Sequence, residues 1–147
     1  MAMAVKFEAF DEAWVARVKG VKSEGGIPGF LGIVITDVAP GRIVAEMEVA
    51  AGLLTRMGNM HGGCLSALCD HVLGTVMYPV MPPKYWAATT EFKINLLAPV
   101  TKGVCRAEAT IIAMTRRMAV VRIEVENEGR LVAAAQGTCT IVAPRAE

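Results

Sequence analysis

The sequence has no excess of either charge and few aromatic residues. Its 15 Lys and Arg residues are balanced by 14 Asp and Glu residues, and Phe, Trp and Tyr make up 5% of the 147 residues. Nucleic-acid-binding surfaces need clustered basic side chains, and stacking platforms need aromatic residues among them. This composition therefore argues against a nucleic-acid-binding protein.

Metal-binding residues are also scarce. The cysteines are Cys64, Cys69, Cys105 and Cys139, without C-x-x-C spacing, and the histidines are His61 and His71. Scattered cysteines in a chain of this size are typical of buried, reduced thiols in an intracellular protein. We therefore expect no metal site and no cofactor.

A secretory signal and an uninterrupted membrane span are missing too. Glu8, Asp11 and Glu12 make the N-terminal segment too polar for a signal peptide. The most apolar long window, residues 64–80, carries Asp70 at its centre, which opposes bilayer insertion by about 2.5–3.5 kcal/mol. A helix that is apolar nearly all round is explained by burial inside protein. The sequence predicts a soluble, cytoplasmic protein that does not bind a membrane.

The N-terminal part of the chain contains one helical pattern and one loop pattern. Apolar side chains recur at helical spacing over residues 7–18 and stop at Gly20, which predicts an amphipathic helix within residues 1–20. The Gly- and Pro-rich residues 23–29 are predicted to form a loop.

The rest of the chain predicts one helix and several antiparallel strands. Residues 31–38 and 42–50 flank a hairpin signal at Ala39-Pro40-Gly41, and residues 62–78 form the apolar helix. Strand-like alternation then sets Phe92, Ile94 and Leu96 against Glu91, Lys93 and Asn95, and continues to a turn at residues 127–129 and a last strand over 131–142. Residues 1–147 are therefore expected to be a single α+β domain.

The sequence His61-Gly62-Gly63 at the start of the apolar helix indicates a functional site. Glycine leaves room for a ligand beside the backbone, and the free N–H groups of a helix start favour negative charge. Asp70 lies further along the same helix, where an unpaired carboxylate is costly in an apolar setting. An anion-stabilising helix end and a carboxylate together suggest hydrolysis through an oxyanion.

Gly62 and Asp70 cannot serve one reacting group from the same helix. Eight residues separate them, which is about 12 Å at the rise of an α-helix. Either the two features are unrelated, or Asp70 acts in the site of another subunit. Two antiparallel copies of the helix, related by a twofold axis near Ser66, would place Asp70 opposite the partner's glycines. We therefore hypothesise an isologous dimer with shared active sites.

The motif Gly58-x-x-His61-Gly62-Gly63, followed by Asp70, resembles the hotdog-fold acyl-CoA thioesterases of the phenylacetate-pathway (PaaI-like) type. Residues 89–99, Thr-Thr-Glu-Phe-Lys-Ile-Asn-Leu-Leu-Ala-Pro, resemble the strand that follows the helix in that family. The resemblance covers a core over residues 30–143. It implies a long central helix wrapped by a curved antiparallel sheet, in a homodimer or homotetramer.

The resemblance also implies an activity. Members of the family hydrolyse an aromatic or medium-chain acyl-CoA to the free acid and CoA. The Gly62 amide would polarise the thioester carbonyl, and Asp70 would act as nucleophile or as general base for water. His61 would orient the turn or contact the thioester, and Thr89 matches a position whose hydroxyl holds the attacking water.

Further residues are candidates for substrate binding. Many relatives carry Asn or Gln where this chain has Thr55, and Asn59 is a possible substitute. Gly63 offers a second amide near the ligand. Arg116 and Arg117 in a predicted hairpin turn suit the phosphates of CoA, although a solvated hairpin tip explains them equally well.

The apolar acyl pocket is expected between subunits, beside Leu53, Leu54 and Met57. Two other functions compete with hydrolysis. A hotdog enoyl-CoA hydratase or dehydratase would place a His–acid pair on the substrate. A non-catalytic acyl-CoA sensor would keep the pocket without needing Asp70.

Overall fold

The computed structural model describes residues 5–145; residues 1–4 of the predicted N-terminal segment lie outside this range. The strands are β1 (Val34–Ala39), β2 (Arg42–Glu48), β3 (Trp86–Leu96), β4 (Val104–Met114), β5 (Met118–Asn127) and β6 (Arg130–Val142). The helices are α1 (Glu12–Val18), α2 (Gly26–Leu31), the 3₁₀ turn η1 (Ala51–Leu53) and α3 (Gly62–Thr75).

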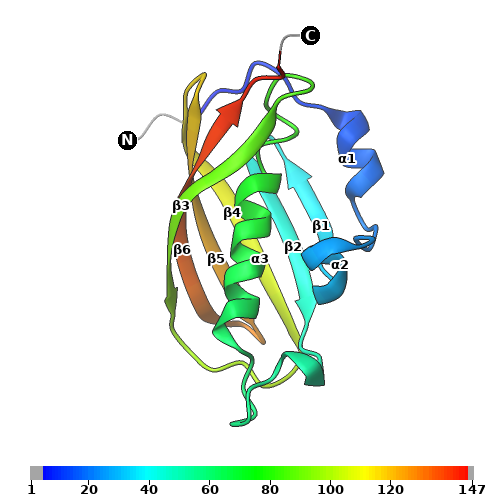
Figure 1. The fold of residues 1–147 in the computed structure, drawn as a ribbon, viewed down its shortest axis with the longest axis vertical. Helices are drawn as coiled ribbons and strands as arrows, with labels where there is room; N and C mark the ends of the chain where they lie inside the picture. Colours follow the sequence, from blue (N-terminus) through cyan, green and yellow to red (C-terminus); the bar gives the residue numbers. More distant parts are fainter. Residues whose placement is uncertain (1–4, 146–147) are drawn as a thin grey trace.

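The strands form one antiparallel sheet in the order β1-β2-β4-β5-β6-β3. Helix α3 lies across one face of this sheet, with β3 at one edge and α1 and α2 beside the other (Figure 1). A central helix against a curved antiparallel sheet confirms the predicted hotdog fold.

Helix α3 packs against the sheet through residues that the apolar pattern identified. The buried side of the helix consists of Leu65, Leu68, Cys69, Val72 and Leu73. The helix ends at Thr75, before the predicted residue 78, and the chain continues in tight turns toward the next strand. Because Asp70 and Gly63 are exposed on α3, one side of the helix is uncovered in a single chain.

The predicted N-terminal helix is shorter than the periodicity of residues 7–18 indicates, because α1 begins only at Glu12. Asp11 sets this start, since its side chain accepts a hydrogen bond from the Trp14 N–H at 2.8 Å. An Asp in that N-cap position satisfies one of the free amides of the first turn.

Phe7 was part of the predicted helical face, but it packs elsewhere. Its ring fills the space where a side chain at Gly41 would stand, in the turn between β1 and β2. The apolar residues of this segment thus cover the sheet directly. The prediction of a loop over residues 23–29 was also wrong in part, since α2 begins at Gly26. It ends at Leu31 and is capped by Gly32, which has a positive φ of 67°.

The edge strand β3 contains a β-bulge that changes which side chains face α3. Its pairing with β6 shifts between Thr89 and Glu91. Phe92 is paired with Gly137, and Thr89 with Cys139, so both lie on the face toward α3. Strict alternation from Phe92 would have placed Thr90 there instead.

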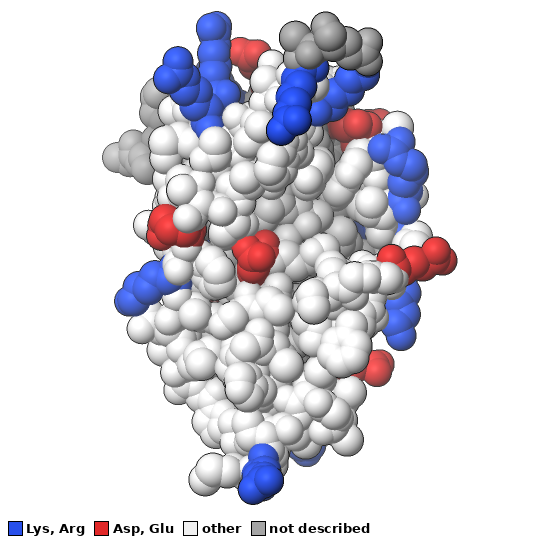
Figure 2. Space-filling view, viewed as in Figure 1, with Lys and Arg blue, Asp and Glu red and all other residues white. Residues whose placement is uncertain are grey.

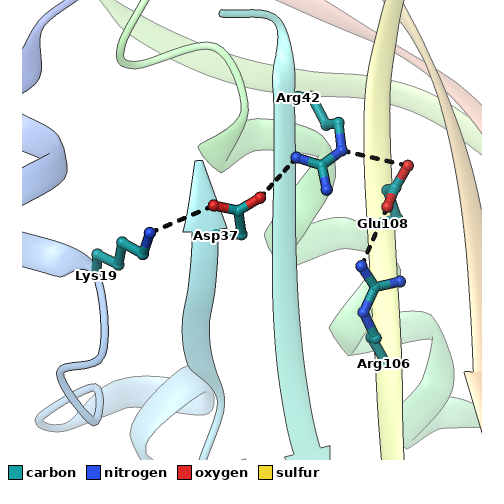
Figure 3. Close-up of polar contacts among 5 residues, drawn as sticks. All are labelled: Lys19, Asp37, Arg42, Arg106 and Glu108. Atoms are coloured by element: carbon teal, nitrogen blue, oxygen red, sulfur yellow. Dashed lines mark hydrogen bonds and ion pairs between the residues drawn. The ribbon is translucent and has the colours of Figure 1, made fainter. Parts of the chain in front are cut away.

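Charged residues connect the first strands with the end of α1 (Figure 3). Asp37 accepts from Arg42 at 2.7 Å and from Lys19 at 3.3 Å. Glu108 forms ion pairs with both Arg42, at 3.4 Å, and Arg106, at 3.3 Å. The hydrogen bond from Arg42, followed by that from Lys19, lowers the pKa of Asp37. At pH values above the ordinary pKa of a carboxyl group, the network therefore stabilises this edge of the sheet. This stabilisation is lost as the pH falls through the lowered pKa of Asp37.

Within residues 5–145, no helix is long and apolar enough to cross a membrane. In the same part of the chain, no three His, Cys, Asp or Glu side chains are grouped so that they could hold a metal ion.

At Gly137, strand β6 lies so close to β3 and α3 that a larger residue should destabilise the protein. A Cβ at Gly137 would lie 2.5 Å from Phe92 Cβ, 2.8 Å from Leu73 Cδ2 and 2.8 Å from the Glu91 carbonyl oxygen. We expect Gly137→Ala to lower the free energy of unfolding by about 1–3 kcal/mol through overpacking, as measured by urea denaturation. Gly52→Ala is the control, because nothing lies within 4 Å of its Cβ position. Equal stability of the two variants would contradict the prediction.

Candidate active site

The start of α3 holds a backbone amide in a position to bind a ligand. His61 is the N-cap residue, and its Nδ1 accepts a hydrogen bond from the Gly63 N–H at 2.9 Å. The Cys64 N–H donates to the His61 carbonyl at 2.9 Å. The Gly62 N–H is left without an acceptor among residues 5–145. It is therefore available to a carbonyl oxygen or an oxyanion.

The cap also determines the state of the His61 ring. Because Nδ1 accepts a hydrogen bond, it carries no proton, and the neutral ring has its proton on Nε2. His61 is exposed. The same side chain thus orders the turn through one nitrogen and offers an N–H donor through the other.

Asn59 was suggested above as a substitute for the Asn or Gln that many relatives carry at the position of Thr55, and the two residues lie side by side. The Thr55 hydroxyl donates to Asn59 Oδ1 at 3.1 Å, and the Thr55 N–H donates to the Asn59 carbonyl at 2.7 Å. Asn59 is half-buried and lines the same cavity as Gly62. An amide side chain therefore lies near the free N–H, although it comes from a different position than in many relatives.

A cavity of about 280 Å³ adjoins Gly62. It is lined by Asn59, Met60, Gly62, Leu65, Leu96, Leu97, Ala98, Pro99 and Val100. Leu53, Leu54 and Met57, which were expected beside the acyl group, are not among these residues. Leu53 lines a separate cavity of about 460 Å³ between α2 and β2, and Met57 is 89% exposed.

Asp70 lies on the uncovered side of α3, in the middle of the helix, and is exposed. Figure 2 shows that the face of the molecule over α3 carries few charged side chains, which gather toward its ends and edges. Asp70 makes no hydrogen bond or ion pair within residues 5–145. A carboxylate without a partner on a weakly charged surface is a candidate for chemistry rather than for a structural ion pair.

Thr89 is paired with Cys139 across β3 and β6, and both Thr89 and Asp70 influence this buried thiol. Burial raises the pKa of Cys139, a hydrogen bond with Thr89 opposes this rise, and the negative charge of Asp70 adds to it. The Cys139 thiol also donates to the Leu73 carbonyl at 3.5 Å. Sequence reasoning missed Cys139, because only the strand register places it opposite Thr89.

The cysteines themselves are poor nucleophiles. Burial raises the pKa of Cys69 to about 12, with a further contribution from the charge of Asp70, and raises the pKa of Cys105 to about 11. Burial raises the pKa of the half-buried Cys64 as well. Thiols in this state stay protonated near neutral pH. The carboxylate of Asp70 is thus the stronger candidate.

His71 is separate from these groups. It lines a groove with Trp14 and Tyr78, whose rings are stacked at 6.1 Å. Its Nε2 is buried without a hydrogen-bond partner among residues 5–145, and burial lowers its pKa despite the opposing charge of Asp70. His71 is therefore a neutral ring on the α1 side of the helix.

Arg116 and Arg117 are exposed in the turn between β4 and β5. The Arg117 carbonyl accepts a hydrogen bond from Ile141, which is paired with Ala87 on β3. The turn therefore lies at the same end of the sheet as Thr89, and at the opposite end of β3 from Leu96 and Gly62.

The candidate residues thus form two separate groups in one chain. His61, Gly62, Gly63 and Asn59 lie at the start of α3, whereas Asp70, Thr89 and the arginine turn lie toward the other end. Along α3, Gly62 and Asp70 are about 12 Å apart. A single chain therefore does not bring the two groups of candidate residues together.

Comparison with known proteins defines the class. The thioesterase superfamily profile matches residues 57–134, which include both groups of candidate residues up to β6. The chain belongs to the thioesterase superfamily, and it is a thioester hydrolase.

Within that class, the chain is similar to PaaI-like proteins. A mutant form of the phenylacetic acid degradation protein PaaI from Thermus thermophilus is 33% identical, with a TM-score of 0.69 over 76% of this chain and 94% of that one. A conserved protein from Pseudomonas aeruginosa is 30% identical, with a TM-score of 0.77 over 81% and 95%. A thioesterase from Haemophilus influenzae, at 22% identity, has the same fold, with a TM-score of 0.73 over 82% and 93%.

Proposed function

We propose that this thioesterase hydrolyses acyl-CoA to a free acid and CoA in active sites shared between two chains. The observation that carries the proposal is the free Gly62 N–H at the start of α3, on the same helix as the unpartnered Asp70. An amide donor and a carboxylate base are the groups that hydrolysis of a thioester requires.

The carbonyl oxygen of the thioester would accept a hydrogen bond from the Gly62 N–H. That amide is fixed by the helix and becomes more effective as negative charge develops on the oxygen in the transition state. The His61 Nε2–H is a second donor beside it, available to the thioester or to the departing thiolate. Asn59 completes the polar side of this half-site.

Asp70 of the partner subunit would supply the base. It removes a proton from a water molecule, and the resulting hydroxide attacks the thioester carbonyl carbon. The Thr89 hydroxyl, on the face of β3 toward α3, would hold this water. The tetrahedral intermediate then collapses, the carbon–sulfur bond breaks, and CoA leaves as the thiolate.

A twofold axis near Ser66 would bring the two half-sites together. Ser66 and Ala67 are small and half-buried, and the Ser66 hydroxyl already donates to the Gly62 carbonyl at 2.9 Å. Antiparallel helices can therefore approach closely without an unpaired hydroxyl between them. Each Asp70 would then face the partner's Gly62.

The edge strand β3 supports the same dimer. It leaves one side of its backbone unpaired over Trp86–Leu96, and exposed strand edges favour pairing with another chain. Trp86, Leu96 and Leu97 are 51%, 53% and 52% exposed. Pairing of β3 with its copy would cover these apolar side chains and place the two copies of α3 side by side.

We further propose that Arg116 and Arg117 bind the phosphates of CoA. In the dimer, their turn would lie near the partner's Gly62, because it is at the Thr89 end of the sheet. Exchanging both for Glu should raise the KM for acyl-CoA about tenfold or more through loss of charge-assisted hydrogen bonds, with little change in kcat. An unchanged KM in steady-state assays would rule out this role, and Arg122→Glu, on the middle of β5, is the control.

The Gly62 amide can be removed without a change of helix. Proline is compatible with the first helical position, and His61 before it has an extended backbone with φ −63° and ψ 132°. Gly62→Pro should lower kcat about 10²–10³-fold relative to Gly62→Ala, because one oxyanion donor is lost. In a thiol-release assay the two variants share the Cβ that meets Leu96, and they differ in that proline carries its ring Cδ in place of the N–H. Equal kcat values would exclude Gly62 as the donor.

Shared sites can be tested by mixing two inactive variants. Asp70→Asn should lower kcat about 10²–10⁴-fold, because the Asn is nearly isosteric and cannot act as a base. When Asp70→Asn and Gly62→Pro chains are unfolded and refolded together, half of the dimers are mixed, and each has one intact site. Activity should then recover to about a quarter of wild type.

Failure of the mixture to recover, with mixed dimers verified by mass spectrometry, would contradict the shared site. An active monomer would do the same. Hydration of crotonyl-CoA would favour the hydratase function, and tight acyl-CoA binding without thiol release would favour the sensor.

A further inference from the structure

Leu96 lies directly against the residue that we assign as the oxyanion donor. A Cβ built on Gly62 would be 2.5 Å from Leu96 Cδ1. The leucine methyl therefore occupies the space that a side chain at position 62 would need. Leu96 comes from the end of β3, and its partner on β6 is Ala133, which places its side chain on the face toward α3.

The cavity beside Gly62 is suited to the acyl group rather than to the nucleotide of CoA. Its lining contains no charged side chain, and besides Asn59 it consists of apolar residues and Gly62. The phosphates of CoA need cations, whereas an acyl chain needs apolar walls. At about 280 Å³ the cavity is small, which favours a compact acyl group over a long chain.

Leu96 lines the cavity together with Gly62. A carbonyl oxygen that accepts from the Gly62 N–H at about 2.9 Å would place the thioester at the Gly62 end of this cavity. The acyl group would extend from there into the cavity past the Leu96 methyl groups. A single CH₂ fits more easily beside a branched side chain than a ring carbon or a branched carbon does.

We propose that Leu96 determines the acyl specificity of the enzyme by excluding bulk at the carbon adjacent to the carbonyl. This inference rests on the proposed function. The substrates it selects are acyl-CoAs that are compact and unbranched at that carbon, such as phenylacetyl-CoA or butyryl-CoA. Benzoyl-CoA and isobutyryl-CoA, which carry the bulk on that carbon, are poor substrates.

Two substitutions at Leu96 should move specificity in opposite directions. Leu96→Ala should raise the ratio of kcat/KM for benzoyl-CoA to that for phenylacetyl-CoA about tenfold or more, a typical effect of a few carbons in an apolar pocket. Leu96→Phe should lower the ratio of kcat/KM for isobutyryl-CoA to kcat/KM for butyryl-CoA. A ratio within one variant is insensitive to the fraction of folded enzyme.

The matched control is Ile112→Ala, which removes the same number of carbons from a β4 side chain that is 41% exposed and does not line this cavity. Its substrate ratios should equal those of wild type. Unchanged ratios in both Leu96 variants, or equal shifts in the Ile112 control, would overturn the role of Leu96.

Binding of unreactive analogues separates this inference from the proposed function. The dissociation constants of S-(2-phenylethyl)-CoA and S-(2-phenylpropyl)-CoA can be measured by calorimetry. These thioethers are without and with a branch at the second carbon from sulfur, which corresponds to the carbon adjacent to the carbonyl in the substrate. If the enzyme releases no thiol but Leu96→Ala improves binding of the branched analogue relative to the unbranched one, hydrolysis is wrong and the role of Leu96 stands. If thiol is released and neither the kinetic nor the binding ratio shifts, hydrolysis stands and the role of Leu96 is wrong.

Discussion

The fixed rise of one α-helix governs the arrangement of the site. An amide at the start of α3 and a carboxylate on its third turn are held about 12 Å apart by hydrogen bonds that neither side chain can alter. No rearrangement of loops brings Gly62 and Asp70 of one chain together. In the proposed dimer, the edge of β3, the small residues on the exposed side of α3 and the weakly charged face over it would form one surface, across which a second chain completes the site.

At the start of α3, the groups that cap the helix differ from the group that is free to bind a ligand. His61 caps the second amide of α3 and not the first, so that the helix is closed while the Gly62 N–H stays free. The same bond fixes the ring tautomer and leaves a donor on the other nitrogen. Leu96 then packs on the side of Gly62 where any other residue would carry its Cβ. The packing of Leu96 thus favours glycine at this position, and the proposed site uses the N–H of the same residue.

Periodicity predicted the elements whose side chains face one continuous core, namely α3 and the strands on either side of it. It failed for the N-terminal segment, because Phe7 packs against the turn at Gly41 and not along a helix face. The six-residue helix α2 was hidden by glycine and proline, which sequence rules assign to loops. His61, Gly62 and Asp70 stood out as a local motif. Cys139 did not, because its place beside Thr89 depends on strand register across 50 residues of chain.

The bulge in β3 has a consequence for how related chains should be aligned. The extra residue, Thr90, shifts the alternation of side chains along β3. After it, the even-numbered residues such as Phe92 face α3, whereas before it the odd-numbered Thr89 does. A hydrogen bond between the Thr90 and Thr140 hydroxyls at 2.6 Å, and one from the Thr138 hydroxyl to the Glu91 carboxylate at 2.6 Å, hold the side chains on either side of the bulge. In a relative without the bulge, the residue that faces α3 at this point is the second before the residue equivalent to Phe92, whereas in this chain it is the third. An alignment without a gap would therefore match that residue with Thr90 instead of Thr89, and a one-residue gap at Thr90 restores the correspondence.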